Sequence, residues 1–201
     1  MCTTKNTDRF IDLIRHGEVE GDPVLRGMTD TPLSLRGNTQ MWQALSHQHP
    51  WQKVLTSPLQ RCATFAKAIA DHCKIPVTTD QRLQEINFGH WEGREIASIL
   101  ETDTALMTTF LKHPFTVTPP HGESPQAMKE RVLLAWQEIT HDLSWDNLLI
   151  ITHGGPIRII LGEILSMPES ALNKIEIPHA NLTRIRIPTG GWPPSLMLHC
   201  H

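Results

Sequence analysis

Two short strings, each with a histidine and a glycine at the end of an apolar run, constrain this chain more than any other feature. Arg15-His16-Gly17 follows the run at 10–14, and His153-Gly154-Gly155 follows the run at 148–152. Such runs are typical of strands buried in a sheet that is covered on both faces. Ligands bind beyond the carboxyl ends of these strands, so we expect the two histidines to converge on one site. The glycines allow a sharp turn and a close approach of a ligand to the backbone.

Apolar runs alternate with stretches of helical periodicity along the rest of the chain. This alternation predicts an α/β fold, a three-layer α/β/α sandwich with a mostly parallel central sheet and helices on both faces. Strands are expected at 10–14, 53–56, 75–78, 148–152, 174–177 and 182–187. Helices are expected after Ser34, after Ser57, within 95–112, after Ser124 and from Pro156 to Leu165. The best helix start is at Ser57, a predicted N-cap with Pro58 at the first helical position and Gln60 at the third.

The length of 201 residues predicts one domain over 1–201, with a helical lid around 95–122. The N-terminus lacks the apolar core of a signal peptide, and no apolar run approaches the ~20 residues that span a bilayer. We therefore expect a cytoplasmic protein without a membrane partner. The formal net charge of −3 comes with no basic block, which argues against nucleic acid and favours a small-molecule ligand. No sequence signal indicates the oligomeric state.

The cysteines and histidines show no metal-binding pattern. Four cysteines stand at 2, 62, 73 and 200 without the spacing of a metal knuckle, so reduced thiols are expected, with Cys62 and Cys73 packed inside. The His47/His49 pair and the His199-Cys200-His201 string lack a third ligand at a recognisable spacing. Neither a metal nor another cofactor is expected.

Residue types at the predicted site favour phosphoryl transfer. Planar guanidinium groups bind phosphate oxygens bidentately, a task that suits Arg15 and Arg61. An imidazole between two cations is disfavoured in its charged form, so His16 should stay neutral and be a candidate nucleophile. A protonated His153 and the backbone amides after it, beginning at Gly154, suit the charge of the transition state. Glu85 and Glu18 are the candidate proton donors for the departing alkoxide.

The chain resembles the histidine phosphatase superfamily, which includes the phosphoglycerate mutases, over nearly its whole length. The resemblance rests on six segments in the same order: 13–18 (LIRHGE), 26–34 with Arg26-Gly27 and TPLS, 57–61 (SPLQR), 83–93 (LQEINFGHWEG), 122–124 (GES) and 152–155 (THGG). It implies a phosphoglycerate mutase-like fold and a phosphohistidine intermediate on His16. It also implies phosphate binding by Arg15, Arg61 and His153, and makes Glu85 the preferred acid over Glu18.

Within the superfamily, the segment Glu85 to Gly93 and the compact length look like the short phosphatases, above all the α-ribazole phosphatases of cobalamin biosynthesis. This resemblance implies hydrolysis of a small phosphate ester, α-ribazole 5'-phosphate, with Glu18 and Arg26 as candidate substrate contacts. Val19 and Asp22 depart from the usual Thr or Ser and Asn, which removes a hydroxyl and adds a charge near the predicted phosphate.

Several other functions are compatible with the same residues. A phosphoglycerate mutase or a sugar-phosphate phosphatase would share the superfamily's chemistry. A metal-dependent hydrolase would use the histidines as ligands and would lose activity to a chelator. A non-catalytic phospholigand-binding module would be expected to lack the nucleophile or an arginine, whereas all five positions are filled here.

Overall fold

The computed structural model describes residues 7–46 and 50–200, and within them one mixed sheet forms the centre of the molecule. The strand order is β3-β2-β4-β1-β5-β6. The strands are β1 (Arg9–Arg15), β2 (Lys53–Thr56), β3 (Val77–Thr79), β4 (Asn147–Thr152), β5 (Leu182–Ile187) and β6 (Ser195–Cys200). The first four of these strands are parallel, while β5 pairs antiparallel with β1 and β6 antiparallel with β5. The predicted α/β class and mostly parallel sheet are therefore confirmed.

His47, His49, Cys2 and His201 lie outside the described residues, as does the side chain of Cys200.

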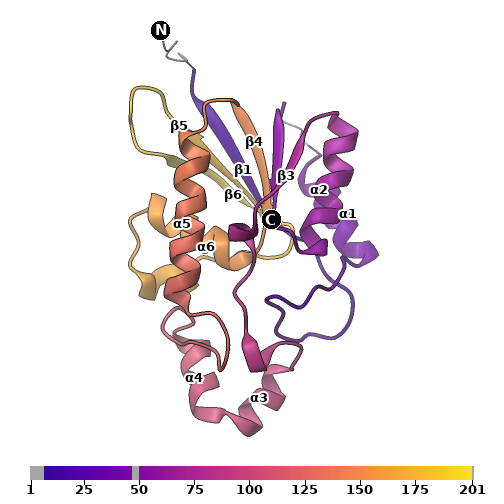
Figure 1. Ribbon diagram of the computed structural model, residues 1–201, viewed down its shortest axis with the longest axis vertical. Coiled ribbons are helices and arrows are strands. Elements are labelled where there is room, and N and C mark those ends of the chain that lie inside the picture. Colours follow the sequence, from indigo (N-terminus) through magenta and orange to yellow (C-terminus); the bar gives the residue numbers. More distant parts are fainter. Residues whose placement is uncertain (1–6, 47–49, 201) are drawn as a thin grey trace.

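Helices cover both faces of this sheet (Figure 1). They are α1 (Leu35–Ala44), α2 (Gln60–Cys73), α3 (Ile96–Thr102), α4 (Thr104–Lys112), α5 (Pro125–His141) and α6 (Gly154–Ile164). The short 3₁₀ turns are η1 (Gln81–Leu83), η2 (Gly89–Trp91) and η3 (Glu169–Lys174). Helices α1 and α2 lie on one face and α5 and α6 on the other.

Strand β4 shows how the alternation of side chains separates two buried cores. Leu148 and Ile150 lie in the core beneath α5 and α6, whereas Leu149 and Ile151 lie in the core beneath α1 and α2. Successive side chains of a strand point to opposite faces, so an unbroken apolar run fits a strand buried on both sides. The sheet thus forms the middle layer of three.

The predicted start of α2 was wrong. The helix begins at Gln60, its N-cap Leu59 makes no side-chain capping bond, and Ser57 lies before the helix. The backbone N–H of Gln60 instead donates to Asp30 Oδ1 at 2.7 Å, so a carboxylate from a distant loop satisfies the helix terminus. Ser57 is left to take part in the site described below.

The end of the sheet also differs from the prediction. No strand forms at 174–177, where η3 ends and an extended segment runs past Arg15, whose Nη1 donates to the carbonyl of Ile177 at 2.6 Å. Strand β6 was not predicted. In the structure Leu196 is half-exposed and Met197 and Leu198 are exposed, so this strand has no buried apolar run. Pairing with β5, rather than burial, produces this edge strand.

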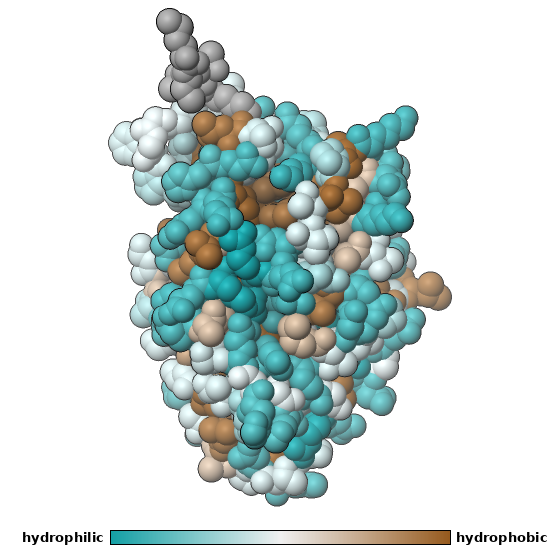
Figure 2. All heavy atoms as spheres, viewed as in Figure 1, coloured by the Kyte–Doolittle hydropathy of each residue, from teal (hydrophilic) through white to brown (hydrophobic). Residues whose placement is uncertain are grey.

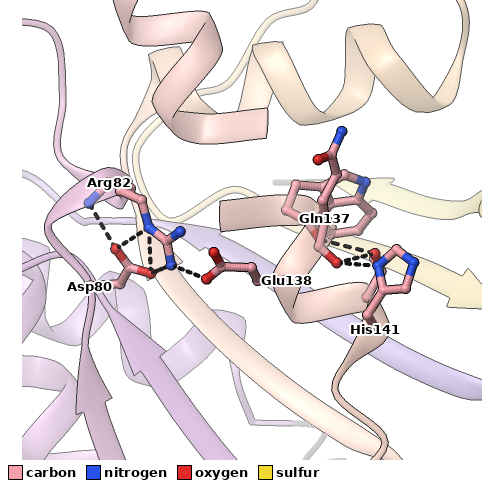
Figure 3. Close-up of polar contacts among 7 residues, drawn as sticks. Asp80, Arg82, Gln137, Glu138 and His141 are labelled. Carbon is pink, nitrogen blue, oxygen red and sulfur yellow. Dashed lines mark hydrogen bonds and ion pairs between the residues drawn. The ribbon is translucent and has the colours of Figure 1, made fainter. Parts of the chain in front are cut away.

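Contacts with α5 hold the segment that follows β3. Arg82 in η1 forms ion pairs with Asp80 and with Glu138 of α5, each at 2.7 Å, as Figure 3 shows. These carboxylates raise the pKa of Arg82 above its usual value. The α3–α4 pair lies at the far end of the molecule, beyond the carboxyl ends of the parallel strands (Figure 1).

The surface is mainly hydrophilic on the face that Figure 2 shows, where hydrophobic groups are small and separate. Within residues 7–46 and 50–200, no helix has the length and apolar character needed to cross a membrane.

Candidate functional site

A cleft of about 400 Å³ opens at the carboxyl end of β1 and brings together four of the predicted catalytic and phosphate-binding residues. These are Arg15, His16, Arg61 and Glu85. Val19 and Arg26 line the same cleft. His153 lies behind His16, with ring centroids 5.2 Å apart. The two histidines that end distant strands therefore converge, as the sequence predicts.

The backbone around His16 is held by both neighbouring segments. Its N–H donates to Thr152 of β4 at 3.0 Å, and its carbonyl accepts from Ala180 at 3.2 Å. A Cβ on Gly17 would overlap the backbone of Gly37 in α1, so the glycine lets the helix approach.

The hydrogen bond of the His16 ring identifies which ring nitrogen carries the proton. Nδ1 lies 2.8 Å from the carbonyl oxygen of Gly17, which can only accept, so Nδ1 carries the proton. The ring is 7% exposed, and this burial, followed by the nearby charges of Arg15 and Arg61, lowers the pKa of His16 well below its usual value. The neutral ring therefore keeps its lone pair on Nε2. Neutral His16 was predicted from the two cations, but burial is the larger cause.

Arg61 is the most buried charge in the site, with 1% of its surface exposed. Its Nη1 donates to the carbonyl of Thr29 at 2.8 Å, and its Nη2 donates to the carbonyl of Gly27 at 2.6 Å. Its Nε donates to His153 Nδ1 at 3.3 Å. Three of the five guanidinium N–H bonds are thus directed to described residues, which orients the group and leaves two for a ligand.

Glu92 holds the loop that orients Arg61. Its carboxylate accepts at 2.8–3.1 Å from the backbone N–H groups of Gly27, Met28, Thr29 and Phe88. Burial opposes the charge of Glu92, but the Thr29 hydroxyl and these N–H groups together lower its pKa below the usual value. The sequence showed Glu92 only as part of a motif, because its partners Gly27, Met28 and Thr29 lie more than sixty residues earlier in the chain.

Arg15 presents a donor that the described residues leave unsatisfied. Its Nε is buried and has no hydrogen-bond partner among them. Leaving such a donor unpaired costs about 1–3 kcal/mol, and more for a charged group, which an anionic ligand would relieve. Burial lowers the pKa of Arg15, while the carboxylate of Glu85 opposes this shift.

His153 does not carry the predicted charge. It is fully buried, and burial, together with the charges of His16 and Arg61, lowers its pKa well below the usual value. Its Nδ1 accepts from Arg61, so Nε2 is the protonated nitrogen and donates to Ser57 Oγ at 2.7 Å. The prediction of a protonated His153 is wrong for the free site, because burial disfavours the charged ring and the two guanidinium groups nearby add to this effect.

Glu85 is half-buried at the edge of the cleft. Its Oε2 accepts from the backbone N–H of Gly155, in the first turn of α6, at 3.2 Å. Arg131 of α5 donates to the carbonyl of Glu85 at 3.1 Å and pairs with Glu123 at 2.6 Å. Arg131 was missed by the sequence reasoning, because nothing local marks it as a partner of 82–85.

The other candidate substrate contacts separate into two groups. Arg26 faces the cleft, while its Nη2 donates to the carbonyl of Glu20 at 3.1 Å. Glu18 instead accepts from Ser34 Oγ at 3.0 Å beside the start of α1 and does not line the cleft. Val19 faces the cleft, whereas Asp22 is exposed and lies outside its lining.

Two further residues near the site were missed. His179 lines the cleft with its ring centroid 5.6 Å from that of His16. Arg158 of α6 lies beside Gly154, where an added Cβ would be 3.1 Å from Arg158 Nη1 and 3.8 Å from Arg15 Nε. Gly154 thus lies between two guanidinium groups at a helix N-terminus, a setting that favours an anion.

Among the described residues, no cluster of three or more His, Cys, Asp or Glu suits a metal ion.

The two neutral histidines predict a specific pH dependence of stability. Their pKa values are lowered on folding, so the unfolded chain binds more protons than the folded chain below about pH 6.5. The free energy of unfolding therefore decreases as the pH decreases. Between about pH 7.5 and about pH 5.5, each imidazole should lower the free energy of unfolding, by up to ~1.4 kcal/mol per pH unit below about pH 6.5. Urea unfolding of the native protein and of a His16→Asn/His153→Gln variant measures it. Parallel pH profiles for the two proteins would contradict the assignment.

The chain is similar to known proteins over most of its length. An Escherichia coli K12 protein named adenosylcobalamin/alpha-ribazole phosphatase is 28% identical over 164 residues, covering 80% of this chain and 81% of the relative. A Klebsiella pneumoniae protein named "Probable phosphoglycerate mutase GpmB" is 27% identical over 184 residues, covering 90% and 86%.

Solved structures share the fold. The alpha-ribazole phosphatase from Shigella flexneri superposes with a TM-score of 0.86 at 24% identity, covering 96% of each chain. A mycobacterial glucosyl-3-phosphoglycerate phosphatase with inorganic phosphate superposes at 0.81 with 23% identity, covering 96% of this chain and 97% of its own. The family model of the histidine phosphatase superfamily (branch 1) matches residues 11–197. The resemblance seen in the sequence is thereby confirmed, and the chain belongs to the histidine phosphatase superfamily, branch 1.

Proposed function

We propose that this protein is a phosphomonoesterase that forms a phosphohistidine on His16. The observation that carries the proposal is the state of that ring, which is neutral and holds its free lone pair on Nε2 between two guanidinium groups. One of these groups, Arg15, has a buried Nε without a partner among the described residues. A nucleophile beside unsatisfied cationic donors suits a phosphoryl group.

In the first step, His16 Nε2 attacks phosphorus and the bond from phosphorus to the ester oxygen breaks. Arg15, Arg61 and the N–H of Gly154 stabilise the charge on the equatorial oxygens. Protonated Glu85 gives its proton to the departing oxygen, which leaves as the alcohol. In the second step, water attacks phosphorus while Glu85 takes a proton from the water, and the bond from phosphorus to His16 Nε2 breaks, which releases phosphate and the neutral ring. His153 contributes as a neutral ring that orients Arg61.

We further propose hydrolysis rather than phosphate transfer between two positions of one molecule. A mutase site must hold a second phosphate while the intermediate reorients, and this needs cations beyond those around His16. Two further cations near the cleft already have partners, since Arg26 donates to the carbonyl of Glu20 and Arg158 donates to the carbonyl of Ile175. A second anion in a partly desolvated site costs free energy in kcal/mol unless a free cation meets it.

The specific substrate that we propose is α-ribazole 5'-phosphate. The name of the Escherichia coli relative and the segment Glu85 to Gly93 support it. The alternatives are a phosphoglycerate mutase or a sugar-phosphate phosphatase, which the names of other relatives favour. We also propose that 1–201 acts as one domain and that the α3–α4 region, within 95–122, covers the cleft as a lid.

The nucleophile is tested by trapping the intermediate. Acid-free quenching during turnover should leave phosphate on His16 in an acid-labile, base-stable linkage, and His16→Ala should retain less than about a thousandth of kcat. Peptide mass spectrometry locates the label, and Cys62→Ala is a control for a nearby nucleophilic atom. Phosphate found on a serine or cysteine would refute the proposal.

The substrate class is tested with a panel of phosphate esters in the presence of a chelator. The kcat/KM for α-ribazole 5'-phosphate should exceed that for 3-phosphoglycerate or a bisphosphorylated sugar by about tenfold, equivalent to ~1.4 kcal/mol. Faster isomerisation of phosphoglycerate than release of phosphate from every monoester would favour the mutase. Complete loss of activity to the chelator would favour the metal-dependent hydrolase.

The role of Glu85 is tested by changing the leaving group. Glu85→Gln should slow hydrolysis of alkyl esters by roughly 10²-fold while sparing the phosphorylation step with acidic phenols, which leave without a proton. Arg61→Ala should impair both classes alike, because it acts on the phosphoryl group that they share. Rapid-quench measurement of His16 phosphorylation separates the two. Equal losses for Glu85→Gln on both ester classes would exclude it as the acid.

A further inference from the structure

A second pocket, of about 210 Å³, shares Glu85 with the catalytic cleft but is not lined by His16. Its walls come from the α3–α4 region and from the first turns of α5 and α6. Most of the lining is apolar, including Phe88, Phe110, Phe115 and Met128. None of the motifs that carry the family resemblance required an apolar chamber here.

Two residues form the wall that this pocket shares with the catalytic cleft. Glu85 and Phe88 line both, so the same carboxyl group borders the phosphoryl site and the second pocket. The carboxylate rests on the N–H of Gly155, which lines the second pocket only. A Cβ on Gly155 would overlap Glu85 and lie 2.5 Å from Met128 Cε, so this glycine keeps the carboxyl group at the pocket wall.

The polar end of the pocket has no strong surplus of positive charge. Arg158 lines it, and burial lowers the pKa of this guanidinium while the carboxylate of Glu85 opposes the shift. Its Nε also donates to the carbonyl of Ile175 at 2.9 Å. With Arg158 as the one cation among the described lining residues, bonded to a backbone carbonyl and sharing the pocket with the carboxyl group of Glu85, the pocket suits a neutral occupant better than a second phosphate.

The size of the pocket limits the occupant further. An apolar cavity of about 150 Å³ binds benzene in another protein, so a pocket of this volume has room for one ring with a short linker. Its aromatic walls suit offset or edge-to-face contact with such a ring.

We propose that this pocket, which we call the leaving-group pocket, binds a compact aromatic or branched hydrocarbon part of the alcohol released by the enzyme. The inference rests on the proposed hydrolysis, because the ester oxygen must reach Glu85 to be protonated, and the next atoms of the alcohol then meet the wall between the cleft and the pocket. It adds phosphate esters with a neutral apolar group close to the ester oxygen to the substrates expected beside α-ribazole 5'-phosphate.

Binding of two phosphonates tests the pocket without any catalytic step. Benzylphosphonate and ethylphosphonate share the phosphoryl end and differ in the group that would enter the pocket. Titration calorimetry on the native protein should give a Kd at least about tenfold lower for the benzyl compound, the gain expected from burying a ring. Equal Kd values would overturn the inference.

Turnover of the matching esters locates the ring. The ratio of kcat/KM for benzyl phosphate to that for ethyl phosphate, both esters of primary alcohols, should fall about tenfold in Phe115→Ser and largely recover in Phe115→Leu. Leu111→Ser is the matched control, since Leu111 lies on α4 of the same region, is 49% exposed and does not line the pocket. The control should keep the native ratio. Thermal unfolding of each variant verifies that it is folded.

The outcomes separate this inference from the proposed function. A protein that hydrolyses both esters with a ratio near one overturns the pocket and leaves the phosphatase intact. A benzyl preference that Phe115→Ser does not change places the ring in the main cleft and also overturns the pocket. A protein that binds the phosphonates selectively but hydrolyses no monoester retains the pocket and refutes the proposed hydrolysis.

Discussion

The buried guanidinium of Arg61 is the constraint on which the rest of the site depends. An uncompensated charge in a protein interior is very unfavourable, so Arg61 must be paired or hydrogen-bonded wherever it is buried. Here it is satisfied by the carbonyls of Gly27 and Thr29 and by the ring of His153. The loop carbonyls are in turn fixed by Glu92, which binds the N–H groups of the same loop. Orienting one cation therefore orders a loop, a second motif and His153, which lies behind His16.

Burial, together with nearby charges that include Arg61, accounts for the protonation state of both histidines. His16 and His153 are buried, and each lies close to Arg61, so both rings are held neutral. For His16 a neutral ring is what nucleophilic attack needs. For His153 it means that the positive charge facing a bound phosphate comes from guanidinium groups, which hold it without titrating near neutral pH. The proposed acid, Glu85, is held separately, since Arg131 of α5 donates to its backbone carbonyl at the cleft edge.

Much of the fold and the first residues of the site could be predicted because their signals are local. The apolar runs of β1 and β4 are unbroken, and Ser124-Pro125 starts α5 as expected, with Ser124 Oγ accepting from the N–H of Ala127. The predictions failed where a distant partner decides. Ser57 has the pattern of a helix cap, yet His153 uses its hydroxyl and Asp30 satisfies the helix. The segment 174–177 has the composition of a strand, but its carbonyls meet Arg15 and Arg158 instead of a neighbouring strand.

The sequence by itself determined the α/β class, the family, and the residues His16, Arg15, Arg61 and Glu85, because strand patterns and ordered motifs depend on neighbours along the chain. Only the tertiary structure decided how those residues are charged, oriented and joined to others. The neutral state of His153, the clamp formed by Glu92, the support of Glu85 by Arg131 and the apolar pocket behind Glu85 all arise between elements far apart in the chain. Burial and hydrogen bonding set these properties, and both depend on which surfaces folding brings together.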